Sequence, residues 1–177
     1  MKVLSSLFVL ASMLLALPAS ADTAFEAAFR TSLLKSFDEA SGKIIQLAEA
    51  IPEDKYGWQP MTGVNTVREV LVHVTETNLA LGGMLGAAPL AGVDRKTVGE
   101  SMQTKAGAIA LTKQAMAHMH GILATIPADQ LTVEVNVFGA KAPRLRAAML
   151  PVDHAHEHLG QLIAYARSNH VTPPWSK

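Results

Sequence analysis

Apolar residues recur every three or four positions through four long segments of the chain, with polar residues between them. This spacing places the apolar side chains on one face of a helix, so each segment is predicted to be amphipathic. The expected helices cover about residues 24–50, 66–83, 101–126 and 143–169. Helices of this kind bury their apolar faces against one another, which predicts an all-α fold, an antiparallel four-helix bundle.

The segments that connect the expected helices differ in length and pattern. Residues 86–99 contain glycine and proline and predict a long crossover between the second and third helices. Residues 132–138 alternate with a period of two, which predicts a short extended segment before the fourth helix, ending at a turn at Gly139. Pro151 lies inside the fourth helix and cannot donate to the carbonyl four residues earlier, so a kink or a restart is expected there.

The N-terminus has a different pattern from the rest of the chain. Lys2 is followed by an apolar run over residues 3–17 and by small residues at 19–21. This order is typical of a secretory signal peptide, predicted to cover residues 1–21 and to leave residues 22–177 as the mature domain. The run is shorter than the roughly 20 residues of a membrane-spanning helix, and no second run follows. We expect an exported protein, periplasmic or secreted, with no membrane contact after cleavage.

Charge and composition narrow the classes of partner and site. The 177 residues, a length that suits one domain, include 15 basic and 15 acidic side chains. This balance gives no positive surface for nucleic acid or anionic membranes, so neither is expected as a partner. The chain has no cysteine, which excludes disulfides, thiolate ligands and a cysteine nucleophile. Any transition metal would therefore be held by nitrogen and oxygen atoms.

Three of the seven histidines lie close together in the fourth expected helix. His154 and His158 lie one above the other on its apolar side, whereas His156 points to the opposite side. Because a buried imidazole needs a partner, this pair is either hydrogen-bonded in the core or shares a metal ion with a third ligand from another helix. A histidine-rich tract that binds metal without a defined site is a further interpretation. His118 and His120 have no companion at this spacing and are expected to be surface or core residues.

Three motifs resemble those of the DinB-like family of small metal-binding four-helix proteins. The first is the loop Tyr56-Gly57-Trp58-Gln59-Pro60. The second is the start of the second helix, with Thr66, Glu69 and His73. The third is the run in the fourth helix that contains His154, His158, Gly160 and Gln161. They occur in the family's order and with family-like separations, so the resemblance covers nearly all of the mature sequence.

The resemblance implies a divalent metal site formed by His73, His154 and His158, with zinc or nickel as the usual ion and water completing its coordination. Two further residues are candidates for orienting a ligand or a bound water. They are Glu69, one turn before His73, and Gln161, one turn after His158. Their alternative roles are a cap carboxylate and a surface amide.

Three histidine ligands leave at least one coordination position open, which is typical of a reactive rather than a structural metal site. A metal in such a site can lower the pKa of a bound water or thiol to about 7 and so supply a nucleophile. Some proteins similar to this chain act as thiol-dependent transferases or isomerases, but their thiols are cytosolic and this chain is expected to be exported. The family often has arginine where this chain has Leu159, so a cation that could hold an anionic substrate is missing there.

Motifs of several other enzyme classes are absent from the sequence. It has no nucleophile elbow, no phosphate-binding loop and no dinucleotide fingerprint, and Gly160 prevents His156-Glu157 from completing a metalloprotease motif. Two hypotheses remain. The chain is either a metal-dependent hydrolase or transferase acting on a small molecule, or a non-catalytic exported metal-binding or stress-associated bundle. The sequence assigns no catalytic residue and no organic cofactor, and it leaves a homodimer open.

Overall fold

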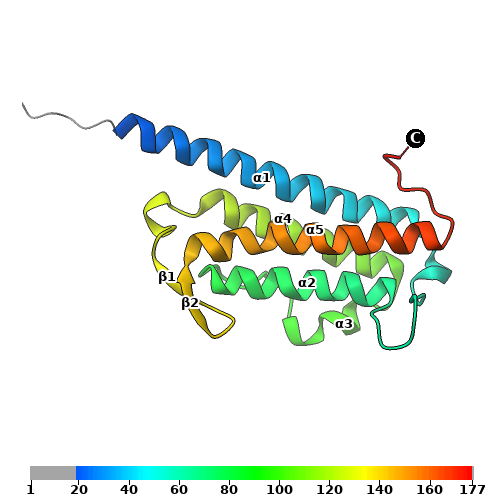
Figure 1. Cartoon of the computed structure of the whole chain (residues 1–177). Helices are drawn as coiled ribbons and strands as arrows, with labels where there is room; N and C mark the ends of the chain where they lie inside the picture. The colour runs from blue at the N-terminus through cyan, green and yellow to red at the C-terminus, as the bar shows by residue number, and fades with distance from the viewer. Residues whose placement is uncertain (1–18, 177) are drawn as a thin grey trace, which may run out of the picture.

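The computed structural model of the chain describes residues 19–176, with side chains from Thr23 onward. Its helices are α1 (Ala19–Ala50), α2 (Val67–Met84), α3 (Val98–Ser101), α4 (Lys105–Thr125) and α5 (Arg144–Ser168). Short 3-10 segments, η1 (Glu53–Lys55), η2 (Arg95–Thr97) and η3 (Ala128–Gln130), lie in the connections. Strands β1 (Glu134–Val137) and β2 (Ala140–Pro143) form an antiparallel hairpin. The four long helices form the predicted bundle (Figure 1).

The long helices run in two opposite directions (Figure 1). α1 and α5 run one way and α2 and α4 run the other way, and each of α1 and α2 packs against both α4 and α5. Every long helix therefore has one parallel and one antiparallel neighbour among the other three. Because α2 and α4 share a direction, the chain between them must return along the bundle. The predicted crossover makes this return and carries η2 and α3 against α2.

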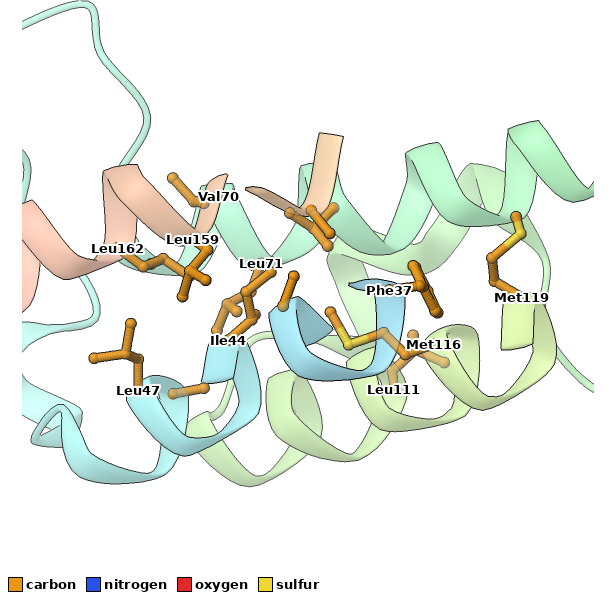
Figure 2. Close-up of a cluster of buried hydrophobic side chains, with 14 of the residues drawn as sticks. Phe37, Ile44, Leu47, Val70, Leu71, Leu111, Met116, Met119, Leu159 and Leu162 are labelled. Atoms are coloured by element: carbon orange, nitrogen blue, oxygen red, sulfur yellow. The ribbon is translucent and has the colours of Figure 1, made fainter. Parts of the chain in front are cut away.

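Buried hydrophobic side chains from all four long helices meet in one core (Figure 2). Fully buried members include Phe37, Ile44 and Leu47 of α1, Leu71 of α2, Met119 of α4 and Leu162 of α5. Phe25, near the start of α1, is 74% exposed and stacks on Phe29. The first turns of α1 extend past the neighbouring helices (Figure 1).

The predicted signal peptide lies mostly beyond the described residues. Residues 1–18 are outside the described part of the chain, and residues 19–21 begin α1, earlier than the expected start near residue 24. Within the described part, no helix combines the length and the apolar character needed to cross a membrane.

The third and fourth expected helices both differ from the prediction, because the third is interrupted and the fourth is not. The third is divided, because α3 ends at Ser101 and α4 begins after Thr104, whose hydroxyl caps the new helix by accepting the Gly107 amide at 3.0 Å. A side chain at Gly107 would clash, since its Cβ would lie 2.7 Å from the Ser101 carbonyl oxygen. The fourth is continuous: a kink or a restart was expected at Pro151, and α5 runs through this buried residue without a restart.

The expected extended segment is confirmed, and it pairs with a second strand that the sequence pattern did not predict. Val137 pairs with Ala140 across a two-residue turn of Phe138 and Gly139. Both turn residues have positive φ, 50° and 90° respectively, as a type I′ hairpin turn requires. The hairpin packs against α5 and α2, which brings it to the face of the bundle that those two helices form.

Helix α2 begins at a capping box, in which Glu69 has the role of a cap carboxylate that the sequence analysis left open. The Thr66 hydroxyl accepts a hydrogen bond from the Glu69 amide at 3.2 Å, and the Glu69 carboxylate accepts one from the Thr66 amide at 2.7 Å. The hydrogen bonds from Thr66 lower the pKa of Glu69, so this carboxylate is charged at neutral pH. The box fixes the first turn of the helix that carries His73 about two turns later.

Replacing the cap tests how much this start stabilises the bundle. We expect Thr66→Ala to lower the free energy of unfolding by about 1 kcal/mol, because an orphaned amide of the first turn loses its acceptor. Urea denaturation followed by circular dichroism measures the change. Thr66→Ser, which keeps the hydroxyl, should stay close to the parent, and an equal loss in both variants would contradict the capping explanation.

Candidate metal centre

Three histidines from two helices converge at the face where α2 meets α5. His73 lies on α2, and His154 and His158 lie one turn apart on α5. The Nε2 atom of His154 lies 3.0 Å from Nε2 of His73 and 3.0 Å from Nε2 of His158. One ring nitrogen from each of the three lies within 4.8 Å of the others. Antiparallel packing of α2 on α5 therefore supplies the third ligand that the pair on α5 requires.

Hydrogen bonds alone cannot satisfy this arrangement. A ring nitrogen of histidine carries either one N–H or one lone pair, and it has only one position for a partner in the ring plane. Nε2 of His154 has two nitrogens at 3.0 Å, so at least one of the two contacts is left without a well-directed hydrogen bond. A cation placed between the rings would accept a lone pair from each of them. The donor set and its spacing thus fit a divalent transition metal.

The hydrogen bonds around His158 fix which of its nitrogens carries the proton. The Tyr165 hydroxyl donates to the carbonyl oxygen of Asn65 at 3.0 Å, and that oxygen can only accept. The Tyr165 oxygen then accepts from the Gln161 amide nitrogen at 2.9 Å. The remaining amide oxygen of Gln161 accepts from Nδ1 of His158 at 2.8 Å. His158 is therefore protonated on Nδ1, and its Nε2 lone pair points to the other two histidines.

The aromatic loop before α2 supports this chain of hydrogen bonds. The ring of Trp58 meets the ring of Tyr165 edge to face at a centroid distance of 5.2 Å. The carbonyl of Trp58 accepts from the Val67 amide, and the Tyr56 hydroxyl donates to the Ala48 carbonyl at 2.6 Å. The loop is thus joined to α1, to the start of α2 and to α5. All three motifs of the sequence meet around one site.

This geometry agrees with a comparison against protein families. A family model described as the DinB superfamily matches residues 36–162, more than half of the chain. The chain belongs to the DinB superfamily. The matched region includes all three converging histidines and Gln161, and the resemblance noted in the sequence is confirmed. A comparison with curated proteins finds no match.

Two solved DinB-like proteins share the fold of this DinB superfamily member. One, from Bacillus subtilis, has a TM-score of 0.64 and 22% sequence identity and covers 80% of this chain and 93% of its own. The other, from Bacillus cereus, has a TM-score of 0.58 and 16% identity and covers 82% of this chain and 95% of its own. At these identities the similarity shows a common fold, and activity has to be argued from the residues of the site.

Partial burial keeps two histidines of the site, His73 and His154, neutral. Loss of solvent lowers the pKa of His154 from 6.5 to about 4, and the neighbouring His158 and His73 rings add to the shift. The pKa of His73 is also lowered, first by burial and then by His158, against an opposing effect of Glu76 and Glu157. Both rings are therefore uncharged at pH 7, as metal ligands must be.

The other residues singled out in the sequence occupy different places. Glu69 is held in the cap of α2 and contributes its carboxylate to Thr66. His156 is exposed on the far side of α5, where Nδ1 lies 2.9 Å from the carbonyl of Val152. His120 of α4 pairs with Asp38 of α1 at 2.8 Å. None of these three residues is part of the group formed by His73, His154 and His158.

An open cleft of about 540 Å³ lies beside the histidines, a size that suits a small organic molecule. Its lining consists of His73, Glu76, Thr77 and Ala80 of α2, Arg95 and Lys96 of η2, Phe138 of the hairpin turn and His154 of α5. Glu76, Arg95, Lys96 and Phe138 belong to none of the motifs in the sequence. Glu76, Thr77 and Ala80 lie three, four and seven residues after His73, and this helical spacing could have predicted that they share its face of α2. No local sequence pattern predicts that Arg95, Lys96 and Phe138 lie beside the histidines.

The hydrogen bond from Gln161 to His158 yields a prediction about metal affinity. We expect Gln161→Leu to weaken divalent metal binding about 10- to 100-fold, because His158 loses the acceptor that fixes its tautomer. Gln161→Glu keeps an acceptor for Nδ1 and should retain most of the affinity. Competition titration with a chromogenic chelator measures both variants. Equal affinities for Gln161→Leu and the parent would show that Gln161 does not position the ring.

The lowered pKa of His154 predicts a loss of stability in acid for the metal-free protein. In the unfolded chain this ring takes up a proton near pH 6.5, whereas in the folded chain it does so only near pH 4. The free energy of unfolding should therefore fall as the pH falls from 6.5 towards 4. Urea denaturation of chelator-treated protein across this range measures the slope. His154→Ala should reduce the slope, and His156→Ala on the exposed face should leave it unchanged.

Proposed function

We propose that this chain is an exported, metal-dependent hydrolase or transferase that acts on a small molecule held in the cleft beside His73 and His154. The observation that supports the proposal is that two of the three converging histidines also line this cleft. A metal held there would face the space where a substrate binds. A buried, closed group of ligands would instead be suited to a structural ion.

The family resemblance implies zinc or nickel, and the donor set is compatible with both ions. Imidazole nitrogens suit both ions, and the chain has no thiolate to offer. A divalent ion held by three neutral imidazoles supplies Lewis acidity and can lower the pKa of water to about 7. The protein contributes the positions of the three ligands, the neutral state of His73 and His154, and a solvent-open cleft on one side.

Glu76 is our candidate for moving a proton in this reaction. It lies one turn after His73, and it is the one carboxylate among the residues that line the cleft. Its carboxylate makes no ion pair with any residue in the described part of the chain. A free carboxylate next to the reacting group can accept a proton from the nucleophile. Water is the nucleophile that we favour, because the N-terminal pattern predicts export and low-molecular-weight thiols are cytosolic.

Metal analysis of the purified protein is the first test. We expect about one zinc or nickel ion per chain by plasma mass spectrometry, and loss of that ion in His73→Ala and His154→Ala. His156→Ala is the matched control, because it removes a histidine from the same helix on the side away from the site. Retention of the ion in both site variants would overturn the proposed ligand set.

Activity is tested separately from metal binding. The metal-loaded protein is assayed against chromogenic carboxylic esters, amides and phosphate esters, and Glu76→Gln is compared with the parent at equal metal content. We expect turnover that chelation abolishes and that Glu76→Gln lowers about 100-fold or more. Bound metal without turnover on any of these substrates would favour the non-catalytic metal-binding bundle instead.

A further inference from the structure

The cleft beside the histidines has walls of unlike chemistry. Its floor is the face of α2 that carries His73, Glu76, Thr77 and Ala80, which follow one another at helical spacing. Arg95 and Lys96 of the crossover form one wall, and Phe138 of the hairpin turn forms another. In Figure 1 the hairpin and α3, which follows η2 directly, lie on the same side of α2 and are separated along its length.

The backbone of the wall formed by Arg95 and Lys96 is held in place, and the positive charges of this wall remain unpaired within residues 19–176. Asp94 caps η2, and its carboxylate accepts a hydrogen bond from the Lys96 amide at 2.9 Å. Within residues 19–176, neither Arg95 nor Lys96 forms an ion pair through its side chain. Glu76 is the only opposing charge in the lining, so the cleft retains a net positive character. A guanidinium and an ammonium on adjacent residues match the oxygens of a carboxylate or a phosphate.

Phe138 is exposed and conformationally unfavourable at the tip of the hairpin. Its side chain is 68% exposed, and its φ is 50°, a left-handed conformation that a bulky residue rarely adopts. Asparagine or aspartate before glycine is the usual choice in such a turn, because these residues tolerate positive φ. Phenylalanine at this position therefore lowers stability both through its exposed apolar ring and through its unfavourable backbone conformation. Strain of this kind is found where a side chain is needed for function.

We propose that the cleft binds an organic oxyanion that also carries an apolar group, with Arg95 and Lys96 holding the anionic end and Phe138 covering the apolar part. The bond to be broken or transferred then lies on the side of His73 and His154. This inference names the substrate class for the proposed function, and it relies on that function for the reacting end alone. Ala80, which also lines the cleft, leaves room for the bound molecule because its side chain is small.

Ligand binding to the metal-free protein tests the inference without reference to activity. The probes are 4-phenylbutyrate and phenyl phosphate, which have both features, 4-phenylbutanol, which lacks the charge, and acetate, which lacks the ring. Chelator-treated protein prevents the anions from binding to a metal, and NMR titration measures each dissociation constant. We expect one of the first two probes to bind at millimolar concentration or below, and the last two to bind at least about fivefold more weakly.

Three variants assign the binding energy to the walls. Arg95→Gln with Lys96→Gln should weaken the anionic aromatic probe about tenfold and leave 4-phenylbutanol unaffected, because exposed charge contacts are each worth only a few-fold. Lys35→Gln, on the exposed side of α1, is the matched control for a lost charge. Phe138→Asn should weaken the same probe about two- to tenfold. It should also raise the melting temperature, since asparagine relieves the strained turn.

Four results would overturn the inference. Two concern the probes: a failure of both aromatic anions to bind at millimolar concentrations, and equal binding of charged and neutral probes. Two concern the variants: unchanged binding in the Arg95 and Lys96 double variant, and unchanged binding in Phe138→Asn. Metal content of the same variants is measured in parallel and should equal that of the parent. A protein that holds no metal but binds the probes as expected would contradict the proposed function and leave this inference intact.

Discussion

A nitrogen of an imidazole ring has room for one partner in the ring plane, and this limit governs the face where α2 and α5 meet. His154 has the Nε2 atoms of His73 and His158 at the same distance, 3.0 Å. Loss of solvent around His154 and His73 lowers the pKa of both rings, which disfavours their protonation. At most one of the two contacts at Nε2 of His154 can be a well-directed hydrogen bond, whereas a cation between the rings would accept a lone pair from each of them. The packing of two helices thereby brings together three imidazoles that could hold a metal ion.

The chain of hydrogen bonds from Asn65 to His158 places a hydrogen on Nδ1 of the His158 ring. A backbone carbonyl cannot donate, so every hydroxyl and amide along the chain has one possible orientation. Tyr165 is held by the edge of Trp58, and the loop that carries Trp58 is tied to the first amide of α2. The aromatic loop, the capped start of α2 and the histidine run of α5 are therefore parts of one structure. Loss of any of them would loosen the ring of His158.

The sequence predicted those parts of the molecule that depend on helical periodicity. The bundle, the inward pair on α5 and the cap at Thr66 follow from spacing within a single helix, and the place of His73 followed from the family resemblance. The division of the third helix depended on Gly107, whose role is apparent only when the Ser101 carbonyl is in place. Phe138, Arg95 and Lys96 reach the cleft through two connections, and their placement depends on how the hairpin and the crossover pack against α2. Periodicity carries no information about such contacts.

The positive side chains of the cleft come from the crossover and not from α5. Leu159, at the position where the family often has arginine, is 8% exposed and packs in the core beside Leu162 and Val70 (Figure 2). An arginine there would have to leave the core or be buried without a partner, which is costly. Arg95 and Lys96 provide positive charge from η2 with no such penalty, since both are exposed. The long helices thus bring the three histidines together, whereas the connections form the walls of the cleft beside them.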